Sequence, residues 1–515
     1  FEIVFVLLSL LGMMAALIAD KMRPGMVLFS VVVLFLCVGI LTPKEMLEGF
    51  SNKGMITVAL LFLVSEGIRQ SGTLGQVIKK LLPQGKTTVF KAQLRILPSV
   101  AFISAFLNNT PVVVIFAPII KHWAKSVKLP ATKFLIPLSY VTILGGICTL
   151  IGTSTNLVVH GMILEAGYEG FTMFELGKVG IFIAIAGIIY LFIFSKRLLP
   201  DARPDTAVPD EEVEEGEKLH RVEAVLGARF PGINKKLSDF NFQRHYGAEV
   251  KEIKTRNGQR YVDHLEDVVL REGDTLVVMA DDTFIPTWGE SSVFVLLTNG
   301  NDPDTSGKKK RWLALILLVL MIVGATVGEL PATKEMFPDI KLDMFFFVCI
   351  TTIIMAWTNI FPARKYTKYI SWDILITIAC AFAISKAMVN SGVADCVAGF
   401  IIGLSDDYGP HVLLAILFVI TNLFTELITN NAAAALAFPL ALSISAQLGV
   451  SPTPFFVVIC MAASASFSTP IGYQTNLIVQ GIGNYKFTDF VRIGLPLNII
   501  TFLISVILIP LIWNF

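Results

Sequence analysis

The sequence predicts an α-helical polytopic membrane protein made of two inverted repeats, each with a re-entrant helical hairpin and a broken helix, and an inserted small α+β cytoplasmic domain. Three observations predict this fold class. The composition is too apolar for a water-soluble chain, one eleven-residue motif occurs twice at a fixed spacing, and a polar stretch at 201–311 separates two apolar halves.

The composition indicates a lipid environment. Of the 515 residues, 54% are hydrophobic and 16% are charged, against about 45–50% and about 25% in soluble domains. A water-soluble core cannot bury so many apolar side chains, so much of the surface must face lipid. This excludes a soluble enzyme. The net charge of +1 predicts no attraction to nucleic acid, and the six cysteines lack metal-ligand spacing.

Apolar stretches near the roughly 20 residues that cross a bilayer predict the full-length spans. Two further stretches are interrupted by polar motifs, LNNTP at 107–111 within 92–125 and ITNNA at 428–432 within 411–447. Each half is predicted to be too short to cross. Backbone that leaves helical geometry at membrane depth must be covered by protein or line a watery cavity, so both stretches are predicted to be re-entrant hairpins. The full-length candidates are 1–19, 25–41, 55–69, 172–194, 312–329, 343–361, 372–389 and 488–513.

Each predicted hairpin is followed by an apolar segment with a polar break. The motif IGTSTNLVVHG at 151–161 matches IGYQTNLIVQG at 471–481 at seven positions, with a constant offset of 320. The hairpin asparagines at 108–109 and 430–431 recur at an offset of 322. We interpret this as an internal repeat with a broken helix in each copy. The polar residues shared by the two breaks are Gly152, Thr155 and Asn156 in the first and Gly472, Thr475 and Asn476 in the second.

The distribution of Lys and Arg predicts how the repeats are oriented, because short cytoplasmic loops are enriched in these residues. Around the first hairpin, 69–95 carries six and 121–133 carries four, whereas around the second hairpin 389–411 and 447–452 carry none. The first hairpin is therefore predicted to open from the cytoplasm and the second from outside. Lys196, Arg197 and 308–311 flank the polar stretch, which predicts a plasma-membrane protein with this stretch in the cytoplasm.

The polar stretch divides into a linker and a small domain. The segment from 201 to 217 is acidic and contains proline, which favours an extended linker. Alternating runs at 248–255 and 275–280, with turn signals at 257–258 and 272–274, predict short strands. The predicted domains are membrane repeat 1 at 1–197, an acidic linker at 198–218, the cytoplasmic domain at 219–300, a basic linker at 301–311 and membrane repeat 2 at 312–515.

The two tips and two breaks are candidates for an anion site. Half-helix N-termini that meet near the bilayer midplane supply hydrogen-bond donors for a buried anion, as secondary transporters arrange them. The alternative is that the polar tip residues only cap the hairpin helices. The duplicated pattern favours the binding role. The candidate tip residues are Asn108, Asn109, Thr110, Thr429, Asn430 and Asn431.

The motifs LNNTP, TELITNN, TSTN and YQTN resemble those of the divalent anion:sodium symporters, over about 400 residues. The resemblance implies sodium as the co-transported ion, no redox or organic cofactor, an elevator mechanism and a homodimer in the lipid bilayer. Hydroxyl, amide and carbonyl oxygens suit such a hard cation. The resemblance implies one sodium site at Ser104, Asn108, Asn109 and backbone near Cys148, and another at Thr425, Asn430 and backbone near Ser468. It places Thr110, Asn431, Thr149, Thr469 and Pro470 beside the substrate.

The sequence departs from the family pattern at both tips and at both breaks. Asn108 stands where the family has Ser, Asn431 stands where it has Thr, and the breaks lack the usual double proline. The segments 227–259 and 270–280 resemble the C-terminal module of regulators of potassium conductance, the RCK-C module, which occurs in a sulfate-associated branch of these symporters. This predicts sulfate as the substrate, with a C4-dicarboxylate as the alternative. The module implies either a small-molecule or nucleotide regulator or a dimerisation surface.

Three ionisable residues fall in predicted membrane segments, where such residues are functional candidates: Glu66, Lys386 and Glu426. Glu426 is predicted to orient the second hairpin rather than to carry protons, and the other two can lie near helix ends. Two further function classes stay open. One is an ion channel gated by the cytoplasmic module, although no TVGYG-type filter is present. The other is a transporter-like nutrient sensor that binds its ligand without appreciable uptake.

Overall fold

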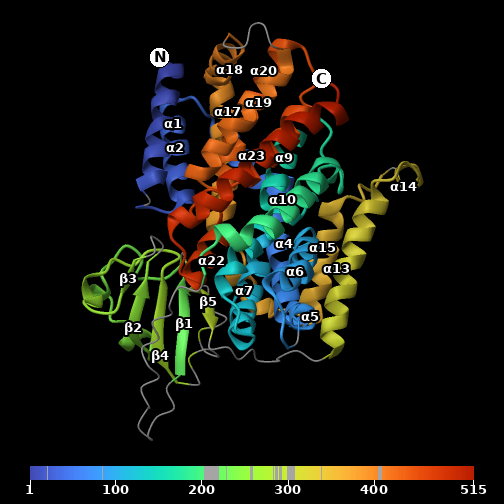
Figure 1. Ribbon diagram of the computed structural model, residues 1–515. Helices are drawn as coiled ribbons and strands as arrows, with labels where there is room; N and C mark the ends of the chain where they lie inside the picture. Colours follow the sequence, from blue (N-terminus) through green and yellow to red (C-terminus); the bar gives the residue numbers. More distant parts are fainter. Residues whose placement is uncertain are drawn as a thin grey trace, which may run out of the picture.

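The computed structural model describes the chain except residues 20, 84, 202–219, 228, 256–258, 282–283, 285–287, 289–292, 299–307, 338 and 404–408. Most of both predicted linkers and the turn at 257–258 lie outside the described residues. Two sets of helices form one elongated body, and a small sheet lies at one end of it (Figure 1). This arrangement confirms the predicted fold class.

The first set of helices precedes the sheet in the chain. Local signals fix its ends, as at α2, which has Pro24 in its first turn and ends at Gly39 with a φ of 83°. A second example is α3, where Thr42 and Glu45 form a reciprocal capping box. The helices are α1 Glu2–Ala19, α2 Pro24–Val38, α3 Pro43–Glu48, α4 Lys53–Gln70, α5 Thr73–Leu81, α6 Val89–Ser104, α7 Asn109–Ser126, α8 Leu135–Gly146, α9 Ser154–Glu165 and α10 Gly177–Leu198.

The second set follows the sheet and repeats the same order. A long helix pair, a hairpin, a broken helix and a closing helix recur, so that α17 corresponds to α4 and α23 to α10. The helices are α13 Lys308–Gly328, α14 Pro331–Met336, α15 Met344–Trp357, α16 Tyr366–Tyr369, α17 Trp372–Asn390, α18 Val393–Gly403, α19 Gly409–Leu427, α20 Asn430–Leu448, α21 Thr453–Ser464, α22 Gln474–Gly483 and α23 Phe487–Ile512.

The contacts between the two sets follow a two-fold pattern. Helix α2 packs on α17, and its counterpart α15 packs on α4. Helix α10 packs on its own counterpart α23. The base of the second hairpin lies with α18 at the end of the body away from the sheet, whereas α5 and the base of the first hairpin lie at the same end as the sheet (Figure 1). The two repeats therefore have opposite orientations, as the loop charges predicted.

Helix lengths correct one sequence-based expectation. Within the described chain, eight helices are long and apolar enough to cross a membrane. Among them are α19 and α20, with 19 residues each, so the prediction that these hairpin halves are too short is wrong. They form a hairpin because the chain reverses at Ile428 and Thr429, and α20 then packs back against α19. Conversely, the predicted spans at 25–41 and 343–361 contain the shorter helices α2 and α15, with 15 and 14 residues.

The insert is a five-stranded antiparallel sheet with strand order β3-β2-β4-β1-β5. Two of its strands, β2 and β4, occupy the runs that the sequence predicted. Aromatic residues, including Phe230, Tyr246 and Phe294, form its separate core with the short helix α11 (Phe242–Tyr246). The strands are β1 His220–Leu226, β2 Glu249–Lys254, β3 Arg260–Tyr261, β4 Thr275–Ala280 and β5 Phe294–Thr298.

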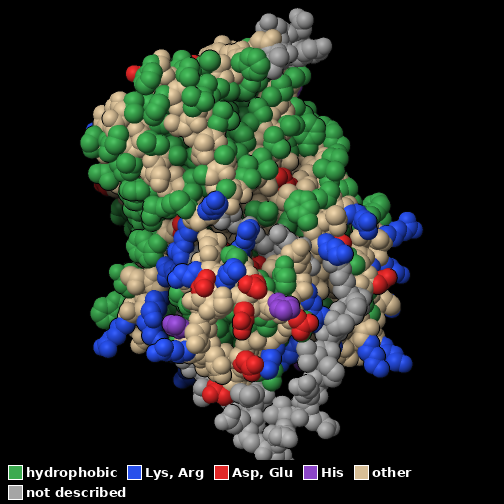
Figure 2. All heavy atoms as spheres, turned by 90° about the vertical axis from the view of Figure 1, so that its left-hand side faces the viewer, with side chains coloured by type: hydrophobic (Ala, Val, Ile, Leu, Met, Phe, Trp, Pro, Cys, Tyr) green, Lys and Arg blue, Asp and Glu red, His purple; other side chains and the backbone are tan. Residues whose placement is uncertain are grey.

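Charge separates the insert from the helices. In Figure 2 the upper, helical part of the visible face is covered by hydrophobic side chains, and Lys, Arg, Asp and Glu gather over the lower part, around the sheet. An apolar band over helices is the surface that lipid requires, because the bilayer interior cannot solvate charge. The sheet therefore lies at the border of the apolar band.

The insert contacts two parts of the helical body. One is helices α7 and α22, and the other is the residues that precede α2 and α17. Its β1 residue Glu223 pairs with Lys121 of α7, with 2.9 Å between Oε2 and Nζ, and Gly273 lies against Leu477 of α22. Two backbone carbonyls before α2 and α17 also accept hydrogen bonds from the insert. These are Lys21 O, from Asn234 Nδ2 at 3.1 Å, and Ile370 O, from an Arg229 guanidinium nitrogen at 3.1 Å.

Candidate functional site

Four helix N-termini from the two repeats meet inside the helical body. They belong to α7 and α20, which follow the hairpin tips, and to α9 and α22, which follow the breaks. Helix α7 packs against α22, and α20 packs against α9, so each tip faces the broken helix of the other repeat. Helix N-termini favour a negative charge. This meeting point is the candidate site, and Asn109 and Asn431 are 1% and 5% exposed there.

The first break is closed by hydrogen bonds to the first hairpin. Asn156 Nδ2 donates to Thr149 O at 2.9 Å. The Thr149 hydroxyl accepts from Gly152 N at 3.1 Å and donates to Ala105 O at the end of α6. These side chains satisfy backbone groups that the interrupted helices leave unpaired.

The second break repeats this pattern. Asn476 Nδ2 donates to Thr469 O at 3.2 Å, and the Thr469 hydroxyl accepts from Gly472 N at 3.3 Å and donates to Glu426 O at 3.1 Å. Thr149 and Thr469 were predicted to lie beside the substrate. Both attach a break to a hairpin backbone, because the hairpin helices end there with carbonyl groups that have no partner within the helix. Their place beside the substrate stays a prediction.

The matched hydrogen bonds also correct the spacing of the repeat. Ala105 and Glu426 accept equivalent bonds, and α7 and α20 begin at Asn109 and Asn430. The hairpins therefore align at an offset of 321. The predicted offset of 322 is wrong, because it followed the two Asn-Asn pairs rather than the helix starts. Thr110 thus corresponds to Asn431.

These corresponding tip residues make reciprocal contacts across the site. Thr110 Oγ1 donates to Gln474 Oε1 at 3.3 Å, and Asn431 Oδ1 accepts from Ser154 Oγ at 3.2 Å. Thr155 Oγ1 adds a second donor to Asn431 Oδ1, also at 3.2 Å. Gln474 and Ser154 are the first residues of α22 and α9. Because Asn431 Oδ1 accepts these two bonds, its Nδ2 group is the part of the amide that can donate to an anion.

The side chains at the N-cap positions of the hairpin helices do not cap these helices and stay available to a ligand. Asn108 and Thr429 occupy the N-cap positions of α7 and α20, yet neither side chain makes a capping hydrogen bond. Thr429 Oγ1 is buried without a hydrogen-bond partner among the described residues. The alternative that these two residues only cap their helices is therefore wrong. Buried polar atoms without partners are uncommon, so the Thr429 hydroxyl is a candidate for contact with a ligand.

Around the first hairpin, the residues predicted to bind sodium are partly together. Ser104 Oγ donates to Asn109 Oδ1 at 2.7 Å, and Gly146 lies so close that an added Cβ would be 2.7 Å from Asn109 Oδ1. The Cys148 carbonyl instead lies against Gly177 of α10. The backbone beside Asn109 is therefore that of Gly146, two residues before Cys148.

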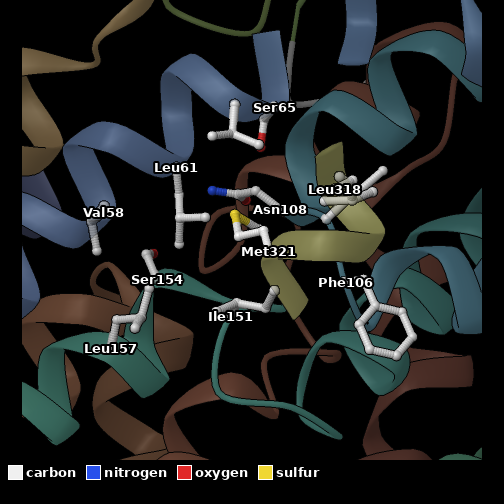
Figure 3. A pocket seen from close by; sticks show the side chains of 12 residues that line it. Val58, Leu61, Ser65, Phe106, Asn108, Ile151, Ser154, Leu157, Leu318 and Met321 are labelled. Atoms are coloured by element: carbon white, nitrogen blue, oxygen red, sulfur yellow. The ribbon is translucent and has the colours of Figure 1, made fainter. Parts of the chain in front are cut away.

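Asn108 lines a small cavity with Ser65 of α4 and Met321 of α13 (Figure 3). Its side chain points into this cavity, which Ile151 of the first break and Ser154 of α9 also line. That Asn108 binds sodium with Ser104 and Asn109 stays a prediction.

The second hairpin carries the corresponding oxygen-rich group. Thr425 Oγ1 donates to Ala463 O at 2.6 Å, and the neighbouring Glu426 carboxylate is held by uncharged donors. These are Ser468 N at 2.8 Å, Asn498 Nδ2 at 2.7 Å and Ser466 Oγ at 3.4 Å. Glu426 thus orients the break beside the hairpin. Pro470, also in this break, is buried.

Tyr473 is a central residue that the sequence analysis did not select. It precedes α22, is 7% exposed, and its hydroxyl accepts from Asn109 Nδ2 at 2.7 Å and bonds Thr153 Oγ1 at 3.1 Å. The Asn430 side chain is a further hydrogen-bond partner. The sequence does mark Tyr473 by a difference between the two breaks, because Tyr473 corresponds to Thr153 at the offset of 320. Asn498 was missed because α23 contains no repeated motif.

The two halves of the site differ in accessibility. Ile151 in the first break is 3% exposed, whereas its counterpart Ile471 in the second break is 52% exposed. Helix α4 packs against α9 beside the first break. The second break lies at the start of α22, which contacts the insert through Leu477. Ile151 of the first break is therefore covered by protein, whereas Ile471 of the second break is exposed.

Comparison with known proteins identifies the family. The sequence pattern of the citrate transporter family matches residues 14–444 and 336–515. The chain belongs to the citrate transporter family. This indicates a membrane transporter rather than an enzyme, and it supports the resemblance to the divalent anion:sodium symporters. The RCK-C resemblance of the insert stays a prediction.

Several relatives of this citrate transporter family member have descriptive names. A putative sulfur deprivation response regulator of Chlamydomonas reinhardtii is 28% identical over 582 residues, which cover 93% of this chain and 96% of the relative. A probable sodium/sulfate cotransporter of the same alga is 32% identical over 282 residues, or 54% of this chain and 31% of the relative. A sodium-dependent dicarboxylate transporter of Staphylococcus saprophyticus is 25% identical over 145 residues, or 28% of each chain.

Proposed function

We propose that this protein is a sodium-coupled symporter of a small divalent anion, with sulfate as the substrate. The observation that carries the proposal is the reciprocal meeting of both hairpin tips with both broken helices. Four N-termini with amide and hydroxyl side chains offer donors to an anion from several directions. Neither tip contains Lys or Arg, so co-transported cations would balance the anion's charge and allow its release.

Sodium is the proposed coupling ion because oxygen groups cluster beside each tip. Ser104 and Asn109 with the Gly146 backbone form one cluster, and Thr425 and Asn430 with the break near Ser468 form the other. Uncharged oxygen ligands suit a hard monovalent cation. The names of the sodium/sulfate and sodium-dependent dicarboxylate relatives support this choice.

Sulfate is favoured over a dicarboxylate by the shape of the donor set. A tetrahedral dianion has acceptor oxygens on all sides, which suits donors that converge from four helix ends. We propose Asn108, Asn109, Thr110, Thr429, Asn430 and Asn431 as the anion-binding group. The second candidate is a C4-dicarboxylate, which the name of the sodium-dependent dicarboxylate transporter relative favours.

An elevator-type mechanism in a homodimer is proposed for the transport cycle, with the hairpins and broken helices as the moving unit. The unequal exposure of Ile151 and Ile471 supports alternating access, because an inverted pair of equivalent gates is open on one side only. The insert, with proposed bounds 219–300, is placed in the cytoplasm, where an RCK-C-like fold could bind a regulator or contact a second copy.

Uptake into proteoliposomes tests the proposal. Purified protein should accumulate radiolabelled sulfate only with an inward sodium gradient, and unlabelled sulfate should compete better than succinate, citrate or phosphate. Conduction without a sodium gradient would favour the channel alternative. Binding of sulfate without uptake would favour the nutrient sensor. Better competition by succinate than by sulfate would favour the dicarboxylate symporter.

A further inference from the structure

One phenolic oxygen joins the two hairpins and the two breaks. Tyr473 comes from the second break, and its hydroxyl contacts Asn109 of the first tip, Asn430 of the second tip and Thr153 of the first break. In the described residues, the Tyr473 hydroxyl is thus shared by all four elements of the proposed anion site.

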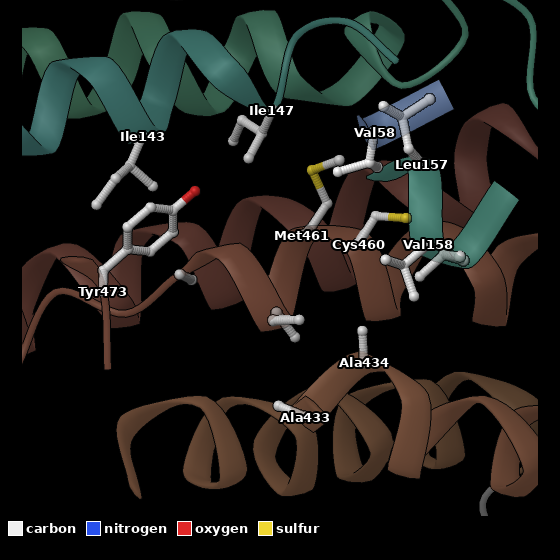
Figure 4. Packing of buried hydrophobic residues seen from close by; sticks show 14 of the residues in the cluster. Val58, Ile143, Ile147, Leu157, Val158, Ala433, Ala434, Cys460, Met461 and Tyr473 are labelled. Carbon is white, nitrogen blue, oxygen red and sulfur yellow. The ribbon is translucent and has the colours of Figure 1, made fainter. Parts of the chain in front are cut away.

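The two repeats differ at this position. Thr153 and Tyr473 each precede a broken helix, with nearly equal backbone angles of φ −138°, ψ 146° and φ −135°, ψ 129°. The two side chains therefore leave the backbone in equivalent directions, but the aromatic side chain reaches much further. Its ring belongs to the same buried apolar cluster as Ile143 of α8, and Figure 4 shows it beside this residue. The ring fills space that an exact repeat would leave open.

The hydroxyl also fixes the orientation of Asn109. Asn109 Nδ2 donates to the Tyr473 hydroxyl, and Asn109 Oδ1 accepts from Ser104 Oγ on the opposite side. The amide oxygen is thereby directed toward the first oxygen cluster. Since Tyr473 accepts from Asn109, its own hydrogen can point to another acceptor, such as an anion oxygen.

We propose that Tyr473 is the specificity-determining residue of the anion site. Its ring restricts the site to compact tetrahedral oxyanions, and its hydroxyl holds Asn109 so that the anion and sodium sites form together. This inference rests on the proposed function and adds to it the residue that separates sulfate from longer dicarboxylates. A pocket that lacks room for the second carboxylate rejects the longer anion by steric exclusion.

Two variants separate the roles of ring and hydroxyl. Tyr473→Phe keeps the ring and removes the hydroxyl, leaving Asn109 Nδ2 without this acceptor. We expect the preference for sulfate over succinate to persist, while the sodium concentration for half-maximal sulfate uptake rises about 5-fold or more. Tyr473→Thr reproduces the residue at 153 and opens the space. We expect succinate to compete with sulfate at least about 10-fold better than in the unmodified protein, a change of about 1.4 kcal/mol in relative affinity.

A matched control removes another buried tyrosine hydroxyl. Tyr485 OH accepts from Ile136 N at 3.3 Å and donates to Thr132 O at 2.5 Å, away from both tips. Tyr485→Phe should leave sodium dependence and anion preference unchanged. Size-exclusion chromatography and thermal unfolding of each variant monitor folding, and Tyr473→Phe, which preserves the ring, keeps the test valid if Tyr473→Thr does not fold.

The outcomes distinguish this inference from the proposed function. If the unmodified protein shows no sodium-driven oxyanion uptake, the proposed function fails. If it takes up sulfate but Tyr473→Phe has unchanged sodium dependence, the role of the hydroxyl is refuted. Unchanged competition by succinate in a folded Tyr473→Thr variant would refute the role of the ring.

Discussion

Lys121 of the first hairpin and Glu223 of the inserted sheet form an ion pair, with 2.9 Å between Nζ and Oε2. Their side chains are 23% and 15% exposed, and Lys254, from β2, approaches the same carboxylate at 3.4 Å. A hairpin that approaches the candidate site at its tip is thus attached at its base to a domain inserted between the repeats.

The charge at this contact should persist across the physiological pH range. Burial alone would raise the pKa of Glu223, but the ammonium groups of Lys121 and Lys254 outweigh it and lower the pKa to about 2. The stabilisation is fully present above the ordinary value of 4.5 and is lost as pH falls through the lower, folded-state value. Glu223→Gln should destabilise the protein by about 3 kcal/mol, because two cations lose their buried partner.

Thermal unfolding in detergent at pH 7 measures the effect of this substitution. Glu249→Gln is the control, since Glu249 forms an exposed pair with Lys251 that should contribute about 0–1 kcal/mol. Equal unfolding temperatures for Glu223→Gln and the unmodified protein at pH 7 would show that the ion pair does not stabilise the docked insert.

Sodium dependence should depend on one asparagine in each tip. Asn109→Ala and Asn430→Ala each remove an amide beside one oxygen cluster, which should raise the sodium concentration for half-maximal uptake by about 5- to 150-fold. Asn390→Ala is a control, because Asn390 lies at the end of α17 and donates to Ile40 O. Sodium titration of sulfate uptake measures the effect. Unchanged titration curves in both tip variants would exclude these residues as sodium ligands.

Anion preference should respond to Asn431. Its Oδ1 accepts from Ser154 and Thr155, which leaves Nδ2 for an anion oxygen. Asn431→Thr replaces this donor by a shorter hydroxyl and should shift the preference toward dicarboxylates by about 1 kcal/mol or more. Competition of succinate against labelled sulfate measures the shift. The prediction is wrong if relative competition does not change while uptake persists.

Glu426 should position the second break without carrying protons. Glu426→Gln keeps an acceptor for Ser468 N and Asn498 Nδ2, so uptake should be reduced but should keep the pH dependence of the unmodified protein. Glu426→Ala, which reproduces the residue at the corresponding position 105, should reduce uptake further. Uptake measured from pH 5.5 to 8.5 compares the variants. A pH dependence that disappears in Glu426→Gln would instead indicate proton coupling.

The orientation in the membrane can be tested with single cysteines in a cysteine-free background. Lys251 is on the insert and Lys334 is on α14, and both are exposed. Helix α14 lies away from the sheet (Figure 1). An impermeant thiol reagent added to intact cells should label Lys334→Cys and not Lys251→Cys. The reverse labelling would place the insert outside the cell.

Sequence analysis predicted the features that depend on local pattern. The offset of 320 between Asn156 and Asn476 identified equivalent residues, whose amides make the same bonds in both breaks. Loop charges gave the opposite orientations of the repeats. The length of α19 does not indicate that the chain reverses at Ile428, because this reversal depends on the packing of α20 against α19.

Features that depend on contacts between the repeats were not predicted. The sequence does not indicate that Thr149 and Thr469 bind hairpin carbonyls, since this requires knowing where α6 and α19 end beside the breaks. Nor does it indicate that Tyr473 reaches Asn109, which is 364 positions away. Comparison of the two repeats identifies the residues that they share, and it does not select Tyr473 because the first repeat has Thr153 at the corresponding position.

The attachment of the insert has a kinetic consequence. The insert is bonded to Lys121 in a hairpin and to the backbone carbonyls of Lys21 and Ile370 before α2 and α17. A hydrogen bond is lost when its donor and acceptor are more than about 3.5 Å apart, so a rigid insert cannot keep both sets of contacts if the hairpin slides past α2 far enough to lengthen one set beyond that distance. Each transport cycle would then have to break and remake one set, and the energy of these few polar contacts would contribute directly to the height of the turnover barrier.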